Sequence, residues 1–144
     1  MSVTAKCFGN FIKAAFNKEI DLDTNDIKVA LFTSATPVDQ DAMVYFDDIT
    51  GEAGGTGYDA GGKALENKTV TYTDNTNVFK FDADNVTWTT SSVTARYAIL
   101  YCATGTAGTS ALISYVDFGE DKTSATGNFT ITWDNAGIFT CTIA

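Results

Sequence analysis

The chain has 144 residues, 44% of them hydrophobic, which is the size and composition of a folded globular protein rather than a disordered segment. Its net charge of −9 argues against direct binding to nucleic acid or to an anionic membrane surface, because both need clustered Lys and Arg. Histidine is absent, which excludes Ser-His-Asp and Cys-His nucleophile systems and histidine-containing zinc sites. We therefore expect no enzyme, no cofactor and no metal site.

Cysteine usage indicates a reducing compartment. Cys7, Cys102 and Cys141 lie far apart in apolar segments, so we expect three buried free thiols and no disulfide framework. The first 18 residues have neither a long apolar core nor an obvious signal-peptide cleavage site, and no apolar run is long enough to span a membrane. These features predict folding in a reducing compartment.

Residues 4–18 are predicted to form an amphipathic helix, because apolar residues recur there at the spacing i, i+3, i+4, i+7 and i+8. These residues are Phe8, Phe11, Ile12, Ala15 and Phe16. The stripe could pack over the protein's own sheet, or its phenylalanines could dock on a neighbouring subunit. Both interpretations use the same residues, and Phe8, Phe11 and Phe16 are accordingly candidate partner-contact residues.

An acidic segment, Glu19–Asp26, follows the predicted helix and begins like a calcium-binding loop. Asp26 stands where such a loop needs glycine, and Phe32 stands where it needs a bidentate glutamate. We therefore expect a surface turn here. The next segment, Ile27–Thr33, is apolar on both faces and is predicted to be a buried strand.

The middle of the chain is rich in turn-forming residues. Ala42–Ile49 is compatible with a short strand or a helical turn. Residues 50–62 carry six of the twelve glycines but lack the Gly-Lys-Ser/Thr ending of a phosphate-binding loop. A surface loop is the expected structure, and in an assembly it is a plausible contact element. Gly54, Gly55 and Tyr58 are its candidate contact residues.

From Ala64 onward, strands alternate with polar turns. Lys68–Thr73 and Val78–Phe81 flank the turn 74–77, and Val86–Thr89 carries Trp88, an expected core residue. Near the end, Asn128–Trp133 and Ile138–Ile143 alternate in polarity, as half-buried strands do.

The predicted centre of the fold is a hairpin formed by Ala95–Ala103 and Ala111–Phe118. Ala98, Leu100 and Cys102 face one side of the first strand, and Tyr97, Ile99 and Tyr101 face the other. Both faces are apolar, so we expect cover on both sides. A turn is expected over residues 119–127.

One helix and about eight strands predict a single mainly β domain over residues 1–144. The expected architecture is a two-sheet antiparallel sandwich, jelly-roll-like or of another Greek-key type, with one N-terminal amphipathic helix at about residues 4–18.

Four segments, in order, resemble a family of small structural proteins of tailed bacteriophage virions, over roughly residues 5–143. They read IKVALFTSA, GTGYDAGGKAL, ARYAILYCATG and LISYVDFGEDK. The resemblance implies a virion component that is assembled in the host cytoplasm and performs no catalysis. Our leading hypothesis is a capsid decoration, or cement, protein that binds the major capsid protein or other virion proteins. Such proteins are commonly homo-oligomers, and a trimer is favoured.

Two alternatives remain open at this point. The chain could be a tail, collar or head-spike component of the same kind of particle. It could also be a carbohydrate-binding module, because several aromatic side chains could stack on sugar rings. They are Tyr45, Tyr58, Trp88, Tyr97, Tyr101 and Trp133.

Overall fold

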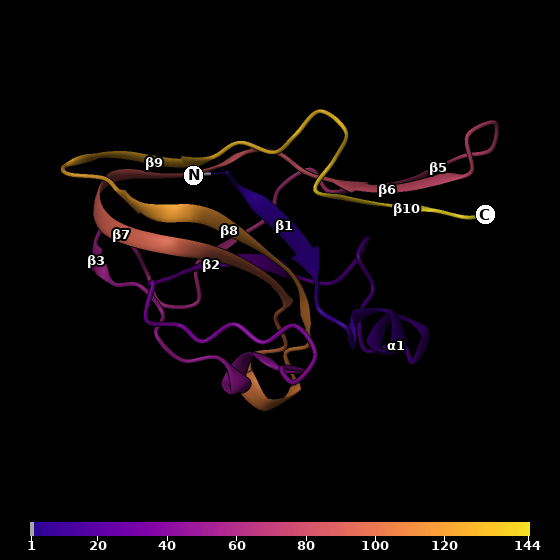
Figure 1. Cartoon of the computed structure of the whole chain (residues 1–144), viewed down its shortest axis with the longest axis horizontal. Coiled ribbons are helices and arrows are strands. Elements are labelled where there is room, and N and C mark those ends of the chain that lie inside the picture. Colours follow the sequence, from indigo (N-terminus) through magenta and orange to yellow (C-terminus); the bar gives the residue numbers. More distant parts are fainter. Residues whose placement is uncertain (1) are drawn as a thin grey trace.

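The computed structural model describes residues 2–144 and is mainly β, with two antiparallel sheets in a sandwich-like arrangement and a short helix near the N-terminus (Figure 1). The seven-stranded sheet contains β1 (Thr4–Cys7), β2 (Ile27–Phe32), β3 (Gly55–Thr56), β4 (Lys63–Ala64), β7 (Val86–Cys102), β8 (Leu112–Thr123) and β9 (Gly127–Ile131). The three-stranded sheet contains β5 (Thr69–Thr73), β6 (Val78–Asp82) and β10 (Phe139–Thr142). The helix α1 covers Phe11–Phe16, and the 3-10 turns η1 and η2 cover Phe46–Asp48 and Ala107–Thr109. The predicted fold class is confirmed.

The long strand β7 organises the larger sheet. The strand order is β1-β8-β7-β2-β4, and β3 and β9 also pair with β7. The predicted strands Val86–Thr89 and Ala95–Ala103 are both parts of this one 17-residue strand. Its partner in the predicted hairpin is β8, which pairs with it in antiparallel register from Tyr101↔Leu112 outward.

A bend in β7 lets this one strand take part in two packed layers of the larger sheet. Its first part pairs with β9, and its second part pairs with β8 and β2. The register with β9 is irregular between Trp88 and Ser91, and Thr90 has a positive φ of 50°. The buried Ser91 hydroxyl lies 2.7 Å from that of Ser124 and 3.2 Å from the Trp88 carbonyl oxygen. These contacts satisfy the two serine hydroxyls that are buried at the bend. The first part of β7, with β9, can therefore lie over the second part (Figure 1).

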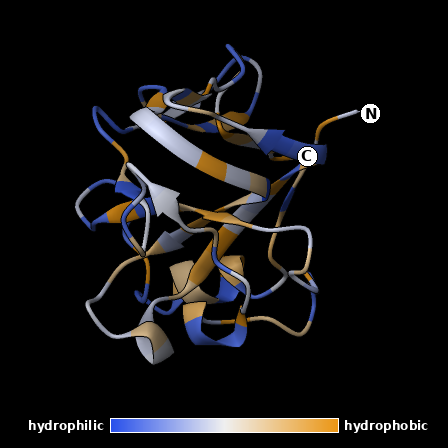
Figure 2. Cartoon of the chain, turned by 90° about the vertical axis from the view of Figure 1, so that its left-hand side faces the viewer, coloured by the Kyte–Doolittle hydropathy of each residue, from blue (hydrophilic) through white to orange (hydrophobic). Residues whose placement is uncertain are grey.

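Two apolar clusters cover the two faces of the central strands, as their sequences predict. Leu100 packs with Val29 in the cluster between the layers, which also holds Trp88. On the opposite face, Ile99 packs with Ala30 in a cluster that the loop residues Met43 and Ile49 also join. Figure 2, which views the molecule from the left-hand side of Figure 1, shows hydrophobic and hydrophilic stretches mixed along the strands.

The helix predicted over residues 4–18 is wrong in its first half. Thr4–Cys7 is the edge strand β1, paired with β8 from Thr4↔Asp117 to Cys7↔Ser114. The helix α1 contains only Phe11–Phe16. The unpaired edge of β8 offers backbone hydrogen bonds to residues 4–7, and a helical spacing of apolar residues does not reveal such a distant partner.

Two further expectations are corrected. The turn expected over 119–127 is much shorter, because β8 continues to Thr123 and β9 begins at Gly127. The three cysteines are also not alike: Cys102 is buried, Cys7 is half-buried and Cys141 is exposed. Burial raises the pKa of the Cys7 and Cys102 thiols above the ordinary value.

The three-stranded sheet forms an arm, defined here as β5, β6 and β10, that projects from the larger sheet on the side of α1 (Figure 1). Its base is held by Phe81, which is fully buried, and by Phe139, whose ring lies 5.2 Å from that of Phe11. No helix among residues 2–144 is long and apolar enough to cross a membrane.

Candidate functional site

The three predicted contact phenylalanines have different environments. Phe8 is 1% exposed and its ring lies 5.3 Å from that of Tyr115, while Phe11 is 3% exposed and contacts Phe139. Both are core residues, in different clusters. Phe16 is 84% exposed and is available to a partner. Of the three phenylalanines in the predicted stripe, Phe8 and Phe11 therefore pack in the core, and only Phe16 lies on the surface.

The glycine-rich loop is held against the body by hydrogen bonds. The predicted contact residue Tyr58 is buried; its hydroxyl accepts a 2.9 Å hydrogen bond from the Leu31 N–H and donates a 2.7 Å bond to Glu52 Oε1. The same carboxylate oxygen accepts a bond from the Gly61 N–H at 2.6 Å. Burial raises the pKa of Tyr58 well above its ordinary value. Tyr58 therefore stabilises the loop instead of facing a partner.

The two glycines predicted as contacts also differ. Gly54 is exposed, with open space where a Cβ would lie. Gly55 pairs with Val93 in the β3–β7 ladder, and a Cβ there would lie 2.0 Å from the Ser92 carbonyl oxygen. This close approach explains the glycine structurally. In Figure 1, β3 and α1 lie on opposite sides of the molecule, so the structure does not bring Gly54 and Phe16 together.

A surface that the sequence did not single out lies on the arm. Directly paired residues of antiparallel strands share a face, and the arm pairs Val70 with Phe81 and Tyr72 with Phe79. The register between β6 and β10 adds Phe139 opposite Phe81, and Cys141 opposite Phe79. One face of the arm is therefore apolar in all three strands.

The other face of the arm is polar except for Val78. It carries threonines from both edge strands, and in β6 it carries Lys80 and Asp82, whose charged groups lie 3.5 Å apart. The arm is thus an amphipathic sheet. Such a sheet normally covers its apolar face with another layer.

That cover is incomplete in this chain. Phe81 is buried at the base and Phe79 and Phe139 are half-buried, but Tyr72 is 53% exposed and Ile143 is 56% exposed. Ile143 extends the same face, because its N–H donates to the Asn77 carbonyl oxygen and continues the register of β10 with β6.

Helix α1 packs at the base of this apolar area and exposes apolar residues of its own. Phe11 brings the helix against Phe139 at the base of the arm, and Ile12 and Phe16 project from the helix with high exposure. We define the arm surface as the exposed apolar residues of both elements. They are Ile12, Phe16, Val70, Tyr72, Cys141 and Ile143. This is the candidate site for contact with a protein partner.

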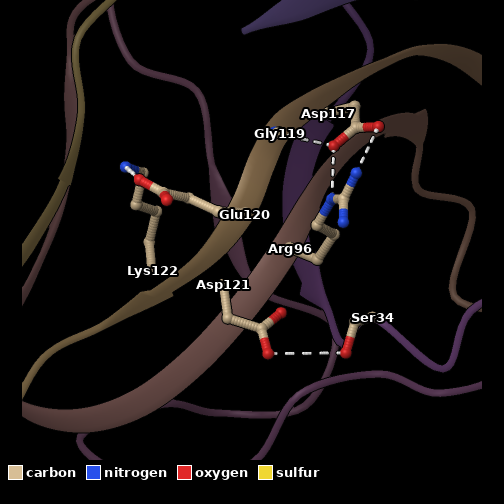
Figure 3. Close-up of polar contacts among 7 residues, drawn as sticks. All are labelled: Ser34, Arg96, Asp117, Gly119, Glu120, Asp121 and Lys122. Atoms are coloured by element: carbon tan, nitrogen blue, oxygen red, sulfur yellow. Dashed lines mark hydrogen bonds and ion pairs between the residues drawn. The ribbon is translucent and has the colours of Figure 1, made fainter. Parts of the chain in front are cut away.

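A polar cluster on the larger sheet has a structural role (Figure 3). The pairing of β7 with β8 shifts between Ala95 and Tyr97, and Arg96 donates two hydrogen bonds to Asp117 there, at 2.6 and 3.2 Å. Asp117 also accepts the N–H of Gly119, whose φ of +81° suits the irregular strand. The contact joins the two strands at their irregular point.

The Arg96 contact predicts a pH dependence of stability. Its hydrogen bonds hold the pKa of Asp117 below the ordinary value. The stabilisation should be complete above roughly pH 4, the unfolded pKa, and should be lost as the pH falls through the folded pKa. Asp117→Asn should therefore lose stability at neutral pH and show a shallower decline in acid. Urea unfolding between pH 2 and 7 measures this, and an unchanged acid slope in the variant would contradict it.

A groove of about 730 Å³ lies beside β8 and β9. Phe118, Phe129 and Ile131 line it together with Trp133. The Trp133 indole N–H donates a hydrogen bond to the Asp84 carbonyl oxygen, so this donor is already paired within the chain. The groove therefore borders the apolar cluster to which Phe118, Phe129 and Ile131 belong.

The aromatic residues considered for sugar binding are mostly unavailable for stacking. Tyr58, Trp88 and Tyr101 are buried, and Tyr45, Tyr97 and Trp133 are half-buried and lie in different parts of the fold. Within residues 2–144, no three Asp, Glu or Cys side chains gather as a metal-binding group.

Comparison with protein-family models, with curated proteins and with solved structures found no match. The support for the arm surface as a contact site is therefore its own geometry. The signal that could have revealed it is the uncharged Thr-Val-Thr-Tyr-Thr strand, whose apolar residues alternate beside a polar turn. Alternation predicted the strand, but the absence of a covering layer is a property of the assembled fold.

Proposed function

We propose that this protein is a structural component of a tailed-bacteriophage virion, specifically a capsid decoration protein that attaches through the arm surface. The observation that carries the proposal is the amphipathic arm, whose apolar face is only partly covered, together with the exposed Phe16 on the helix that packs at its base. The sequence resemblance to small virion proteins supports the kind of partner. The major capsid protein, or another virion protein, would bury these side chains.

The composition of the arm surface suits adhesion. It combines aromatic and aliphatic side chains and has no charged member, in a chain whose net charge is −9. A partner that covers it gains hydrophobic stabilisation without separating ion pairs. A stable attachment needs on the order of 1,000 Å² of buried surface, which the arm and α1 can supply together with residues around them. The protein would act by contact, without catalysis or a cofactor.

The copy number in purified virions tests the proposal. A decoration protein should be present in numbers comparable to the capsid subunits, with density on the outside of the head in cryo-electron microscopy. Quantitative mass spectrometry of the same particles gives the stoichiometry. A few copies per particle, with density at the tail, collar or a head spike, would contradict the decoration role and favour the other virion location.

A further inference from the structure

The outer edge of the arm, strand β5, is open. β5 pairs with β6 alone, and all five of its residues are exposed. Sheet edges are usually protected by charged side chains, proline or a bulge, because unpaired N–H and C=O groups attract another strand. Thr69–Thr73 contains neither charge nor proline, and its register with β6 is regular.

The sequence around β5 is complementary to itself in antiparallel orientation. If two copies pair about Thr71, Val70 lies opposite Tyr72 of the second copy, and Thr69 lies opposite Thr73. In this register odd-numbered residues pair with odd-numbered residues and even with even. Paired side chains therefore lie on the same face of the sheet, and the backbone donors and acceptors of the two edges match.

The charges that flank the strand match in the same register. Lys68 precedes β5 and Asp74 follows it, so each Lys68 meets Asp74 of the second copy just beyond the paired residues. The Lys68 ammonium donates one hydrogen bond to the Asn25 carbonyl oxygen, which leaves two further N–H donors. Opposite charges thus lie at both ends of an uncharged pairing.

We propose that the partner of the β5 edge is a second copy of this chain, bound by antiparallel β5–β5 pairing with its two-fold axis at Thr71. The product is a six-stranded sheet in which the apolar faces of two arms become one continuous surface. The contact is self-complementary and closes on itself, so it gives dimers and not fibres. This dimer contact does not depend on which partner the arm surface binds. It has two-fold symmetry, whereas the family resemblance favours a trimer.

The seven-residue edge Lys68–Asp74 on each side buries less area than the roughly 1,200 Å² at the lower end of standard interfaces. We therefore expect a weak dimer of the isolated protein that dissociates on dilution. Cross-linking detects such a dimer directly. The test uses Cys141→Ser as its background, because Cys141 is the exposed native cysteine.

Thr71→Cys is the decisive variant. A residue on the two-fold axis faces its own copy at a Cα separation of about 4.5 or 5.5 Å, within the range that a disulfide spans. Thr69→Cys is the matched control, because it is equally exposed but lies about 13 Å from its own copy in this register, four residues along the strand. Under a mild oxidant, the first variant should form a covalent dimer and the second should not.

Charge reversal provides an independent measurement. Lys68→Asp should weaken dimerisation roughly tenfold in sedimentation equilibrium, because two attractive pairs become repulsive. Asp74→Lys should do the same, and the double variant should restore the original dissociation constant.

Each outcome decides the proposal. Selective cross-linking of Thr71→Cys together with rescue in the double variant supports it. Equal cross-linking of the Thr69→Cys control, or a protein that stays monomeric at the highest soluble concentration, overturns it. Cross-linking of the unsubstituted chain through Cys141, with none through Thr71→Cys, would place the contact at β10 and also overturn it, as would a trimer indifferent to both charge changes.

Discussion

Replacing Phe11 by serine should lower the free energy of unfolding by at least about 3 kcal/mol, whereas replacing Phe16 by serine should leave it within about 0.5 kcal/mol. Both residues belong to α1, and both follow the same helical spacing in the sequence. Phe11 is buried against Phe139, so its loss removes a large apolar contact and leaves a polar hydroxyl in the core. Phe16 loses no comparable packing, because it is 84% exposed.

The two variants separate folding from attachment. If the arm surface binds the capsid, Phe16→Ser should weaken binding of the purified protein to particles that lack it, while its urea unfolding curve stays unchanged. Lys13→Ser is the control, because Lys13 is exposed on the same helix but is not part of the arm surface. Equal binding by Phe16→Ser and the unsubstituted protein would contradict the role of α1 in attachment.

Gly62→Ala is the second substitution with a large expected effect, and it should lower the free energy of unfolding by at least about 3 kcal/mol. Gly62 has a φ of +73°, and a Cβ there would lie 1.9 Å from the Val29 carbonyl oxygen and 2.7 Å from the Ala30 Cα. Those atoms belong to β2, a central strand of the larger sheet. The clash therefore cannot be relieved by the rotation of a side chain.

Gly105→Ala measures the backbone contribution alone. Gly105 has a φ of +88°, but a Cβ there would meet no heavy atom within 4 Å. This variant should lose about 1–2 kcal/mol, the cost of a left-handed conformation for a residue with a side chain. Chemical denaturation of both variants gives the comparison. Similar losses in the two would show that the close approach of Gly62 to β2 is not what requires glycine.

The features predicted correctly are those that the local sequence determines. Leu100 and Ile99 are apolar neighbours that must point to opposite faces of a strand, so burial of β7 on both sides follows from the sequence alone. The alternation of Phe129 and Ile131 with threonine similarly predicts a half-buried β9.

The errors arise where a distant partner decides the structure. Residues 4–7 are a strand because β8 has a free edge, and Phe8 and Phe11 then enter separate clusters. Tyr58 was predicted to contact a partner, but it is buried for a similar reason. Its hydrogen bonds to Leu31 and Glu52 form only when the loop folds back onto the sheet. The arm surface could be predicted least of all. Its exposure depends on the absence of a covering layer in the folded chain, and no local sequence pattern reports that.

The central position of β7 also affects how fast the chain folds and how readily it aggregates. Its pairing with β2 joins residues about seventy positions apart, from Ile27↔Cys102 to Phe32↔Tyr97, so folding must wait for long-range encounters and should be slow. Until they occur, the uncharged run Ala98–Cys102 is accessible to other chains. Such a segment is prone to intermolecular association. Destabilised forms of this protein should therefore be lost as aggregates during synthesis instead of accumulating as soluble unfolded chains.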